Sequence, residues 1–247
     1  VSSPPDIVDY KSAIVTLRKE LDLFVNVRPI KSLPVDISRP NIDIVMMREN
    51  TEGMYKGIER EENGLAIAER HISEKASKRL AEFTYDYARN NNRKRVTVVH
   101  KANVLRKTCG LFRRTVLAVS ENFPDIETEE VIVDAMAMRL IKEPERFDVV
   151  VTTNLFGDIL SDEASQLVGG LGIAPSGNIG EKTGLFEPVH GSAPKYAGKD
   201  VANPTATFLS AAMMMDFLGE KKEGYTIRNS IFKTFAEGKR TKDLGGD

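Results

Sequence analysis

Apolar and polar positions along this chain switch repeatedly between a helical and a strand-like period. Residues 9–21 carry apolar side chains at helical intervals, and residues 23–28 then alternate as a strand does. The same pattern predicts strands at 42–47, 96–99, 130–133 and 147–153, and helices from Ser73 to the polar run 89–94, at 111–121, and from Asp134 to Pro144. Because strands and helices follow one another in turn, the pattern predicts an α/β fold with a mixed sheet.

The segment 57–72 interrupts this alternation. Its centre, Glu61-Glu62-Asn63-Gly64, has the composition of a tight turn, and both flanks are compatible with strands. We therefore expect a hairpin arm that projects from the body of the protein, a feature that often joins subunits.

Glycine and proline mark a change of organisation toward the carboxyl end. The segment 169–178 is a run of permissive backbone that we interpret as a hinge or crossover between two lobes. Beyond it, Asn203 is expected to cap a helix that has Pro204 in its first helical position, and a last helix is expected at about 225–237.

The composition is that of a globular protein. The chain has 247 residues, 41% of them hydrophobic, and can bury a sizeable core. Its 35 basic and 36 acidic residues leave a formal charge of -1, which excludes nucleic acid as the main partner. No apolar stretch approaches the ~20 residues that cross a bilayer, so we expect a soluble protein without a membrane partner. The single cysteine, Cys109, fits a reducing compartment and inert packing.

The ends of the chain suggest a sequence truncated at both ends. It opens on Val1 without an initiating methionine and stops at Asp247 without a closing helix or strand. We expect a cytoplasmic protein, or a protein of an organelle matrix if a targeting segment is missing.

Asp158 and Asp162 are the strongest candidates for a functional site. They are four residues apart, so a helix would place both carboxylates on one face. They follow the buried strand predicted at 147–153, and ligands bind beyond the carboxyl ends of such strands. A divalent metal is the natural partner of two such close acids. The alternative is a first helical turn whose acids only complement the helix dipole.

Other polar side chains fall at strand ends and in loops: the arginines at 18, 28 and 48, Tyr55 with Lys101, and Asp134. Arginine binds carboxylates bidentately, so three arginines near a metal describe a pocket for a small hydroxy-polycarboxylic acid. A metal held by oxygen alone is Mg²⁺ or Mn²⁺, which can stabilise an enolate after loss of carbon dioxide. Tyr55 and Lys101 would transfer protons. Taken singly, each arginine is more often an exposed ion pair or a stem packed on the surface.

The segment 185–198 has the features of a ligand-binding loop. Its small residues allow close approach of the backbone, His190 offers a flat ring for an adenine, and Lys195 offers a cation for a phosphate. There is no Gly-x-Gly-x-x-Gly, so a standard Rossmann site is not supported. The alternative is an ordinary turn with a structural histidine.

Five segments together resemble the metal-dependent β-decarboxylating dehydrogenases, the family of isocitrate, 3-isopropylmalate and homoisocitrate dehydrogenases. These segments are 18–29, 48–52, 100–103, 157–162 and 187–194, and they occur in family order over nearly the whole chain. Members of that family begin with a strand and a Gly-Asp-Gly-Ile-Gly loop and end with further helical sequence, neither of which is present here.

The resemblance implies the isopropylmalate dehydrogenase-like two-domain fold. Residues 1–23 and 169–247 would belong to the larger, cofactor-binding domain, and residues 24–168 to a smaller domain for dimerisation and substrate binding. Lys101 and Asp134 would reach into the active site of a second subunit, which implies a homodimer or dimer-based oligomer with shared active sites.

The resemblance also implies roles by position. Tyr55, Lys101 and Asp134 would be catalytic, and Ser12, Arg18, Arg28 and Arg48 would bind the substrate. Asp134, Asp158 and Asp162 would bind the metal, and Glu187, His190, Gly191, Ser192, Ala193, Lys195, Tyr196 and Asn203 would bind the cofactor. The reaction would oxidise the 2-hydroxyl with hydride transfer to NAD(P)⁺ and then decarboxylate the product.

Two positions bear on specificity. Lys195 stands where NAD-dependent relatives usually have aspartate, which favours NADP, whereas the segment 241–246 resembles the NAD-dependent branch. Ile14 stands where isocitrate dehydrogenases have asparagine, and a buried isoleucine cannot satisfy a carboxylate. We therefore favour 3-isopropylmalate or homoisocitrate over isocitrate. A non-catalytic regulatory subunit of a heteromeric dehydrogenase is the alternative of another class, although no residue needed for the chemistry is lost.

Overall fold

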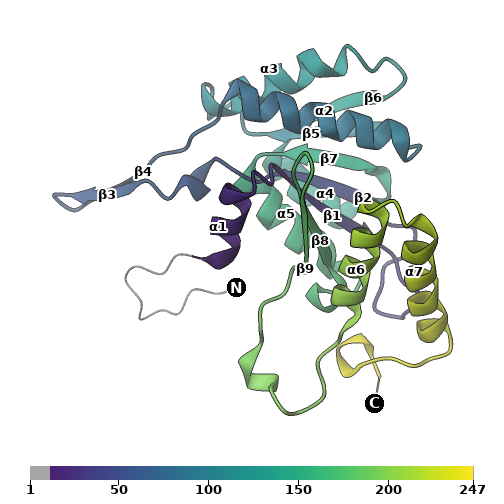
Figure 1. Ribbon diagram of the computed structural model, residues 1–247. Helices are drawn as coiled ribbons and strands as arrows, with labels where there is room; N and C mark the ends of the chain where they lie inside the picture. The colour runs from purple at the N-terminus through teal and green to yellow at the C-terminus, as the bar shows by residue number, and fades with distance from the viewer. Residues whose placement is uncertain (1–11, 247) are drawn as a thin grey trace. The chain divides into compact units, whose positions relative to one another are not determined.

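The computed structural model describes residues 12–246, which divide into two compact units (Figure 1). The first unit comprises the described residues up to Leu23, the segment Val27–Asp43, and the chain from Asp162 onward. The second comprises Phe24–Asn26 and Ile44–Ser161. The chain passes from the second unit to the first between residues 161 and 162, whereas the domain boundary predicted from the sequence lies between residues 168 and 169. Residues 27–43, which were predicted to belong to the smaller domain, fall in the first unit.

The second unit is built on parallel strands. They are β2 (Asp43–Glu49), β5 (Arg95–His100), β6 (Glu127–Ile132) and β7 (Val149–Thr152), in the order β6-β5-β7-β2. Every neighbouring pair among them is parallel. All four residues of β7 are buried, as the apolar run at 147–153 predicts for an inner strand. Parallel pairing brings the carboxyl ends of these strands to one edge of the sheet.

Four helices complete this part of the chain: α2 (Glu74–Asn90), α3 (Thr108–Ser120), α4 (Val133–Lys142) and α5 (Asn154–Gln166), the last of which continues into the first unit. Figure 1 shows α2 and α3 side by side against β5. The predicted cap is confirmed, because the Ser73 hydroxyl accepts a hydrogen bond from the Ala76 amide at the start of α2. The predicted helix that carries both aspartates is also confirmed.

The predicted hairpin arm is confirmed and projects from the second unit (Figure 1). Strands β3 (Glu59–Glu62) and β4 (Leu65–Ala68) pair antiparallel. Asn63 and Gly64 join them with φ of 53° and 76°, the two positive values that a tight hairpin turn needs. The 3₁₀ turn η1 (Met54–Lys56) precedes the arm.

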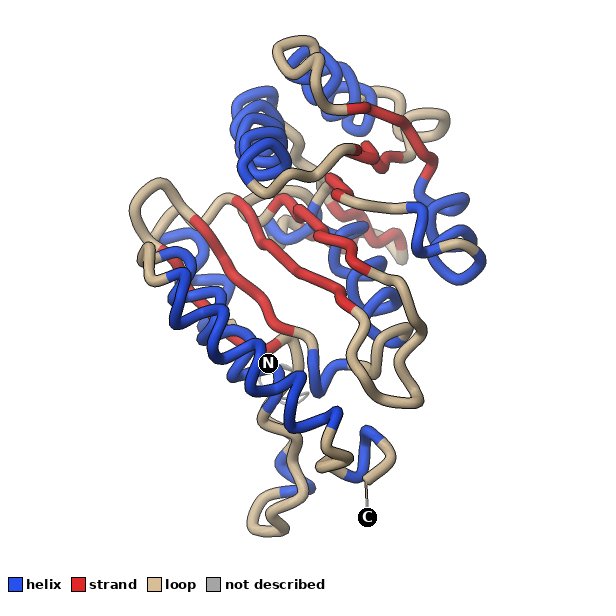
Figure 2. Tube along the Cα trace, turned by 90° about the vertical axis from the view of Figure 1, so that its right-hand side faces the viewer, coloured by secondary structure: helices blue, strands red, loops and turns tan. Residues whose placement is uncertain are grey.

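The first unit contains α1 (Ala13–Glu20), most of β1 (Val25–Lys31), β8 (Pro175–Ile179), β9 (Gly184–Pro188), α6 (Thr205–Phe217) and α7 (Lys221–Ala236). Its strands are ordered β1-β8-β9, with β8 and β9 antiparallel, which makes the fold mixed as predicted. Helix α6 packs on both β8 and β9, and Figures 1 and 2 agree in placing α7 beside α6. The predicted helix at 9–21 lies partly outside the described residues.

Three expectations for this unit need correction. Residues 175–178 are not a permissive loop but part of strand β8, whereas Gly169 and Gly170 do adopt positive φ of 133° and 87°. Helix α6 begins at Thr205, so Pro204 precedes the helix, although the Asn203 side chain does accept a hydrogen bond from the Thr205 amide. Helix α7 begins at Lys221 rather than near residue 225.

Among residues 12–246, no helix combines the length and the apolar character needed to cross a membrane.

Candidate active site

Arg48 is the most firmly held side chain of the candidate site. It lies near the end of β2 and is only 1% exposed. Its Nε and Nη2 both donate to Oδ1 of Asn154, at 3.0 and 2.7 Å, and its Nη1 pairs with Asp158. The guanidinium also lies 5.1 Å from the ring centroid of Tyr55. Four contacts therefore fix the orientation of a cation that burial alone would disfavour.

Tyr55 completes this cluster from the turn η1. Its hydroxyl donates to Oδ2 of Asp158. Burial raises the pKa of the Tyr55 phenol, and the hydrogen bond to Asp158 raises it further, against the opposing effect of Arg48. The phenol is therefore protonated at neutral pH and can act as a proton donor.

Gly157 allows α5 to lie close to Arg48. A Cβ atom at residue 157 would lie 2.7 Å from Cγ and 2.8 Å from Cβ of Arg48, and 3.2 Å from Cγ2 of Thr152. Real Cβ atoms do not approach other atoms so closely, so only glycine fits here. The glycine one position before Asp158 is thus part of the geometry that brings Arg48 and Asp158 together.

The acids that follow Arg48 shape the turn after β2. Glu49 is buried and accepts hydrogen bonds from the amides of Thr51 and Glu52, at 2.8 and 3.0 Å. Glu52 accepts from the amide and hydroxyl of Ser73, at 2.7 and 2.9 Å. Burial raises the pKa of Glu52 despite these hydrogen bonds. Both carboxylates are engaged within the protein, which fits a structural role better than a metal-binding one.

Lys101 directly follows the last residue of β5. Asp134 is the second residue of α4, which begins where β6 ends. Their side chains form an ion pair. The hydrogen bond from Lys101 holds the pKa of the Asp134 carboxyl below its usual range. Lys101 and Asp134, which the family resemblance assigns together to the active site of a second subunit, are therefore neighbours within one chain, and Asp134 is an acceptor that orients the Lys101 ammonium group.

In the first unit, two more of the expected arginines are paired with acids. Arg28, on β1, is 7% exposed, and its Nη1 donates to Oδ1 of Asp162 at 2.9 Å. Arg18, near the end of α1, has Nη2 at 3.6 Å from Oε1 of Glu187 on β9. The Ser12 hydroxyl makes no capping hydrogen bond to α1. All four substrate-binding candidates lie within the described residues: Ser12 directly before α1, Arg18 on α1, Arg28 on β1 and Arg48 near the end of β2.

The two acids of α5 lie one helical turn apart, as predicted, and each pairs with an arginine of its own unit. Within residues 12–246, no three histidine, cysteine, aspartate or glutamate side chains come close enough to hold a metal ion. Asp134 pairs with Lys101 instead. The proposed three-acid metal site across two polypeptides remains a prediction.

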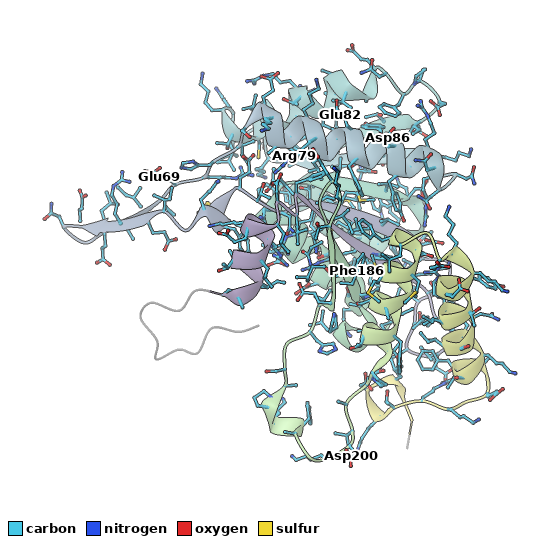
Figure 3. The ribbon with its side chains drawn as sticks, in the orientation of Figure 1. Glu69, Arg79, Glu82, Asp86, Phe186 and Asp200 are labelled. Atoms are coloured by element: carbon cyan, nitrogen blue, oxygen red, sulfur yellow. The ribbon has the colours of Figure 1, made fainter. Side chains whose placement is uncertain are left out.

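The cofactor-binding candidates lie in and around the loop that follows β9. Residues 191–200 are exposed, and Figure 3 shows Asp200 at the outer end of this loop. Nδ1 of His190 lies 2.9 Å from the carbonyl oxygen of Gly191. Its Nε2 is buried and has no hydrogen-bond partner in the described part of the chain. Lys195 Nζ lies 5.0 Å from the Tyr196 ring centroid, and Asn203 donates to Asp243 at 3.0 Å.

Sequence reasoning missed Asn154 and Arg70. Arg70 follows the arm and donates to Thr108 and Thr153, at 3.1 and 2.9 Å, and to Sγ of Cys109 at 3.0 Å. It therefore ties the start of α3 to the start of α5. A polar residue at the start of a buried helix could have drawn attention to Asn154, but no local signal distinguishes Arg70 from the other surface arginines.

Comparison with known proteins gives a consistent result. A family model described as isocitrate/isopropylmalate dehydrogenase matches residues 3–247. The homoisocitrate dehydrogenase of Methanocaldococcus jannaschii is 52% identical over 255 residues, which cover 99% of this chain and 73% of that protein. The 3-isopropylmalate dehydrogenase of Methanothermobacter thermautotrophicus is 53% identical over 234 residues, which cover 94% of this chain and 71% of that protein.

A solved structure agrees with these relatives. The crystal structure of isocitrate dehydrogenase from Methylococcus capsulatus matches with a TM-score of 0.94 and 44% identity, covering 99% of this chain and 74% of that one. The predicted fold class and enzyme class are confirmed, and the names of the relatives match the predicted oxidative decarboxylation of a 3-substituted malate. The chain belongs to the isocitrate/isopropylmalate dehydrogenase family.

Proposed function

We propose that this protein oxidises and decarboxylates a 3-substituted malate, with 3-isopropylmalate and homoisocitrate as the favoured substrates and isocitrate as the alternative. The observation that carries the proposal is the fixed, buried guanidinium of Arg48, which adjoins Asp158 and Tyr55. A preorganised arginine suits a substrate carboxylate, and an adjacent phenol suits proton transfer to the same molecule.

Each group in the second unit has a proposed task. Arg48 binds a carboxylate of the substrate, and Tyr55, which is protonated at neutral pH, supplies a proton to the enol that decarboxylation leaves. Lys101 exchanges a proton with the substrate, and Asp134 orients its ammonium group. In the first unit, Ser12, Arg18 and Arg28 are proposed to bind the rest of the acid.

The donor set fits a hard divalent metal. Asp134, Asp158 and Asp162 offer only carboxylate oxygens, which Mg²⁺ and Mn²⁺ prefer. When bound, such a metal supplies Lewis-acid stabilisation of the negative charge that develops on the substrate oxygen. Asp158 and Asp162 lie one turn apart on a single helix, which supports their assignment as a pair.

The loop after β9 fits a dinucleotide. The buried Nε2 of His190 has no hydrogen-bond partner within residues 12–246 and could bond to a nucleotide base, and in the same residues the Lys195 ammonium group lies over the ring of Tyr196 and forms no ion pair with a carboxylate. A lysine without a carboxylate partner favours a phosphate, which supports NADP over NAD. Glu187, Gly191, Ser192, Ala193 and Asn203 are proposed to complete this site.

We also propose a homodimer, or an oligomer of dimers, with shared active sites. The exposed hairpin arm and the exposed carboxylate of Asp134 support this arrangement, because both are available to a second copy of the chain. A shared site would also explain why three acids assigned to one metal do not gather within residues 12–246 of one chain.

A substrate panel tests the proposal. Purified protein would be assayed with 3-isopropylmalate, homoisocitrate and isocitrate, each with NADP⁺ and NAD⁺ and with Mg²⁺ or Mn²⁺. We expect the highest kcat/KM for one of the first two acids, with NADP⁺ preferred, and loss of turnover with EDTA. Metal-dependent turnover only of isocitrate would favour the alternative substrate. Turnover only after addition of a different chain would instead identify a regulatory subunit.

A further inference from the structure

His100 forms a closed turn around Lys101. It is the last residue of β5 and only 6% exposed, and its Nδ1 accepts a hydrogen bond from the amide of Ala102 at 3.2 Å. This bond spans Lys101, in the way that an aspartate or asparagine side chain closes a turn on the amide two residues ahead. The backbone amide beyond Lys101 is thereby fixed to the end of the strand.

The backbone of Lys101 is also fixed on its carbonyl side. Its carbonyl oxygen accepts hydrogen bonds from the amides of Val104 and Leu105, at 3.1 and 2.8 Å. The backbone is therefore fixed on both sides of the Lys101 Cα atom, and this fixes the direction in which the side chain starts. A long, flexible side chain depends on such a support to present its terminal atom reproducibly, and Lys101 presents its Nζ to Asp134.

The hydrogen bond to Ala102 requires one tautomer of the ring. Nδ1 can accept only if it carries no proton, so a neutral His100 must carry its proton on Nε2. Nε2 lies 3.3 Å from Oε1 of Glu130 on the neighbouring strand β6, in an electrostatic contact that is not a well-aligned hydrogen bond. Glu130 is in turn held by Arg113 of α3, whose Nη2 donates at 2.7 Å.

We propose that His100 is a positioning residue for Lys101. As the Nε2–H tautomer, which Glu130 favours electrostatically, it closes the turn that aims the Lys101 ammonium group at Asp134. The importance of this position for turnover rests on the proposed proton-transfer role of Lys101. His100 does not itself belong to the groups assigned to bind substrate, cofactor or metal, so it acts only through the turn.

The protonation state of the ring is consistent with this role. Burial lowers the pKa of His100, Glu130 counteracts the shift, and Arg113 adds to it, with a net lowering. The ring is therefore neutral at neutral pH, where Nδ1 keeps the lone pair that the Ala102 amide needs.

A pair of substitutions separates the two ring nitrogens. In His100→Asn the side-chain amide can place an acceptor near the position of Nδ1, whereas in His100→Gln the longer side chain carries its amide near the position of Nε2. We expect His100→Asn to keep slow hydrogen exchange at the Ala102 amide and a kcat within about threefold of the unmodified protein. We expect His100→Gln to lose that protection and to lower kcat about 10- to 100-fold, with a smaller change in KM.

The matched control is His71, an exposed histidine whose Nε2 lies 3.1 Å from Glu69 (labelled in Figure 3) at the base of the arm. His71→Gln should leave both kcat and the exchange of Ala102 unchanged. Equal loss of protection in the Asn and Gln variants, or a Gln variant that matches the unmodified protein, would overturn the proposal.

A measurement on the unmodified protein keeps the proposal testable even if a variant does not fold. ¹⁵N NMR of the histidine ring distinguishes the two nitrogens, and a proton found on Nδ1 at neutral pH would overturn the assignment. Neither this spectrum nor the exchange of Ala102 requires turnover. An inactive but folded protein with the expected tautomer and exchange pattern would refute the proposed function while leaving the turn assignment intact.

Discussion

At the scale of single residues, the partners of Arg48 explain how one buried cation can serve a ligand. The uncharged Oδ1 of Asn154 accepts hydrogen bonds from both Nε and Nη2, which fixes the guanidinium plane without neutralising its charge. Asp158 supplies the counter-charge at Nη1. The residues predicted from the sequence thus depend on an asparagine that was not predicted, because its role is visible only after residues more than 100 positions apart are brought together.

Replacing Asp158 by asparagine tests the metal assignment. We expect metal-dependent turnover to fall by at least about 10²-fold, because the change removes a proposed metal ligand and the counter-charge of Arg48. Turnover and Mn²⁺ titration would be measured together. Asp86→Asn, at an exposed position of α2 labelled in Figure 3, is the control and should leave both unchanged. An active Asp158→Asn variant with normal metal affinity would refute the assignment.

The protonation of His100 predicts a pH dependence of stability. Its pKa is lowered in the folded protein, so below the ordinary histidine pKa of 6.5 the unfolded chain takes up a proton that the folded chain does not. The free energy of unfolding should therefore decrease as the pH falls from 6.5 toward the folded pKa, and level off below it. Glu130 and Arg113 are the charged groups that act on this ring.

Urea unfolding between pH 7.5 and 4.5 would measure the effect. The difference between the unmodified protein and His100→Asn isolates the contribution of this ring from those of other titrating groups. We expect the asparagine variant to show the shallower decrease. Parallel curves for the two proteins would contradict the lowered pKa.

At the scale of elements, helix α5 serves as the frame of the candidate site. It carries Asn154, Asp158 and Asp162, and Gly157 lets it approach β2 within the second unit. This approach could not be predicted from the sequence, because glycine within a helix usually signals flexibility or a helix end. Here its reason is steric and lies in Arg48.

Gly157→Ala is expected to disturb the site more than a helical Gly→Ala change usually would. Alanine has the higher helix propensity, but its Cβ would meet the base of the Arg48 side chain at 2.7 Å, where little movement is available. We expect a loss of about 1–3 kcal/mol in the free energy of unfolding, and a larger KM for the acid. Gly110→Ala on α3 is the control, since its nearest contact would be the end of Arg114 at 3.8 Å.

The start of α2 offers a second prediction at this scale. Ser73 both caps the helix and donates to the buried Glu52, so Ser73→Ala should cost about 1–2 kcal/mol in urea unfolding. Ser73→Thr keeps the hydroxyl and should recover most of the loss. Equal stability of the alanine variant and the unmodified protein would mean that neither hydrogen bond contributes.

At the scale of the whole molecule, the elements that could be predicted from the sequence are those in which apolar residues recur at a regular spacing. The parallel strands and their helices were predicted because apolar positions recur with a clear period. Strand β8 was not, because Pro175-Ser176-Gly177-Asn178 has the composition of a loop. Its strand conformation comes from pairing with β9, and Gly177 packs closely there, since a Cβ would lie 3.1 Å from both Met213 and Phe186. Such contacts are tertiary and leave no local pattern.

Shared active sites can be tested by mixing two inactive variants. Lys101→Met and Asp158→Asn would each inactivate the protein, but a mixed dimer would contain one site with both changes and one with neither. Unfolding and refolding an equal mixture should restore roughly a quarter of the unmodified activity, because about half of the dimers are mixed and one of their two sites is intact. Refolding each variant alone is the control. No recovery in the mixture would indicate that each site is built from one chain.

The hairpin arm has two unlike edges. The residues of β3 are Glu59, Arg60, Glu61 and Glu62, and all four are exposed, whereas β4 consists of Leu65, Ala66, Ile67 and Ala68. A free strand edge invites other strands to add to it, and charge is the usual protection against such aggregation. An isolated pair of strands is also barely stable in water. The charges on β3 therefore oppose fibril growth along that strand. The aliphatic strand β4 is the side on which the hairpin arm of a neighbouring molecule would pair and stabilise this one.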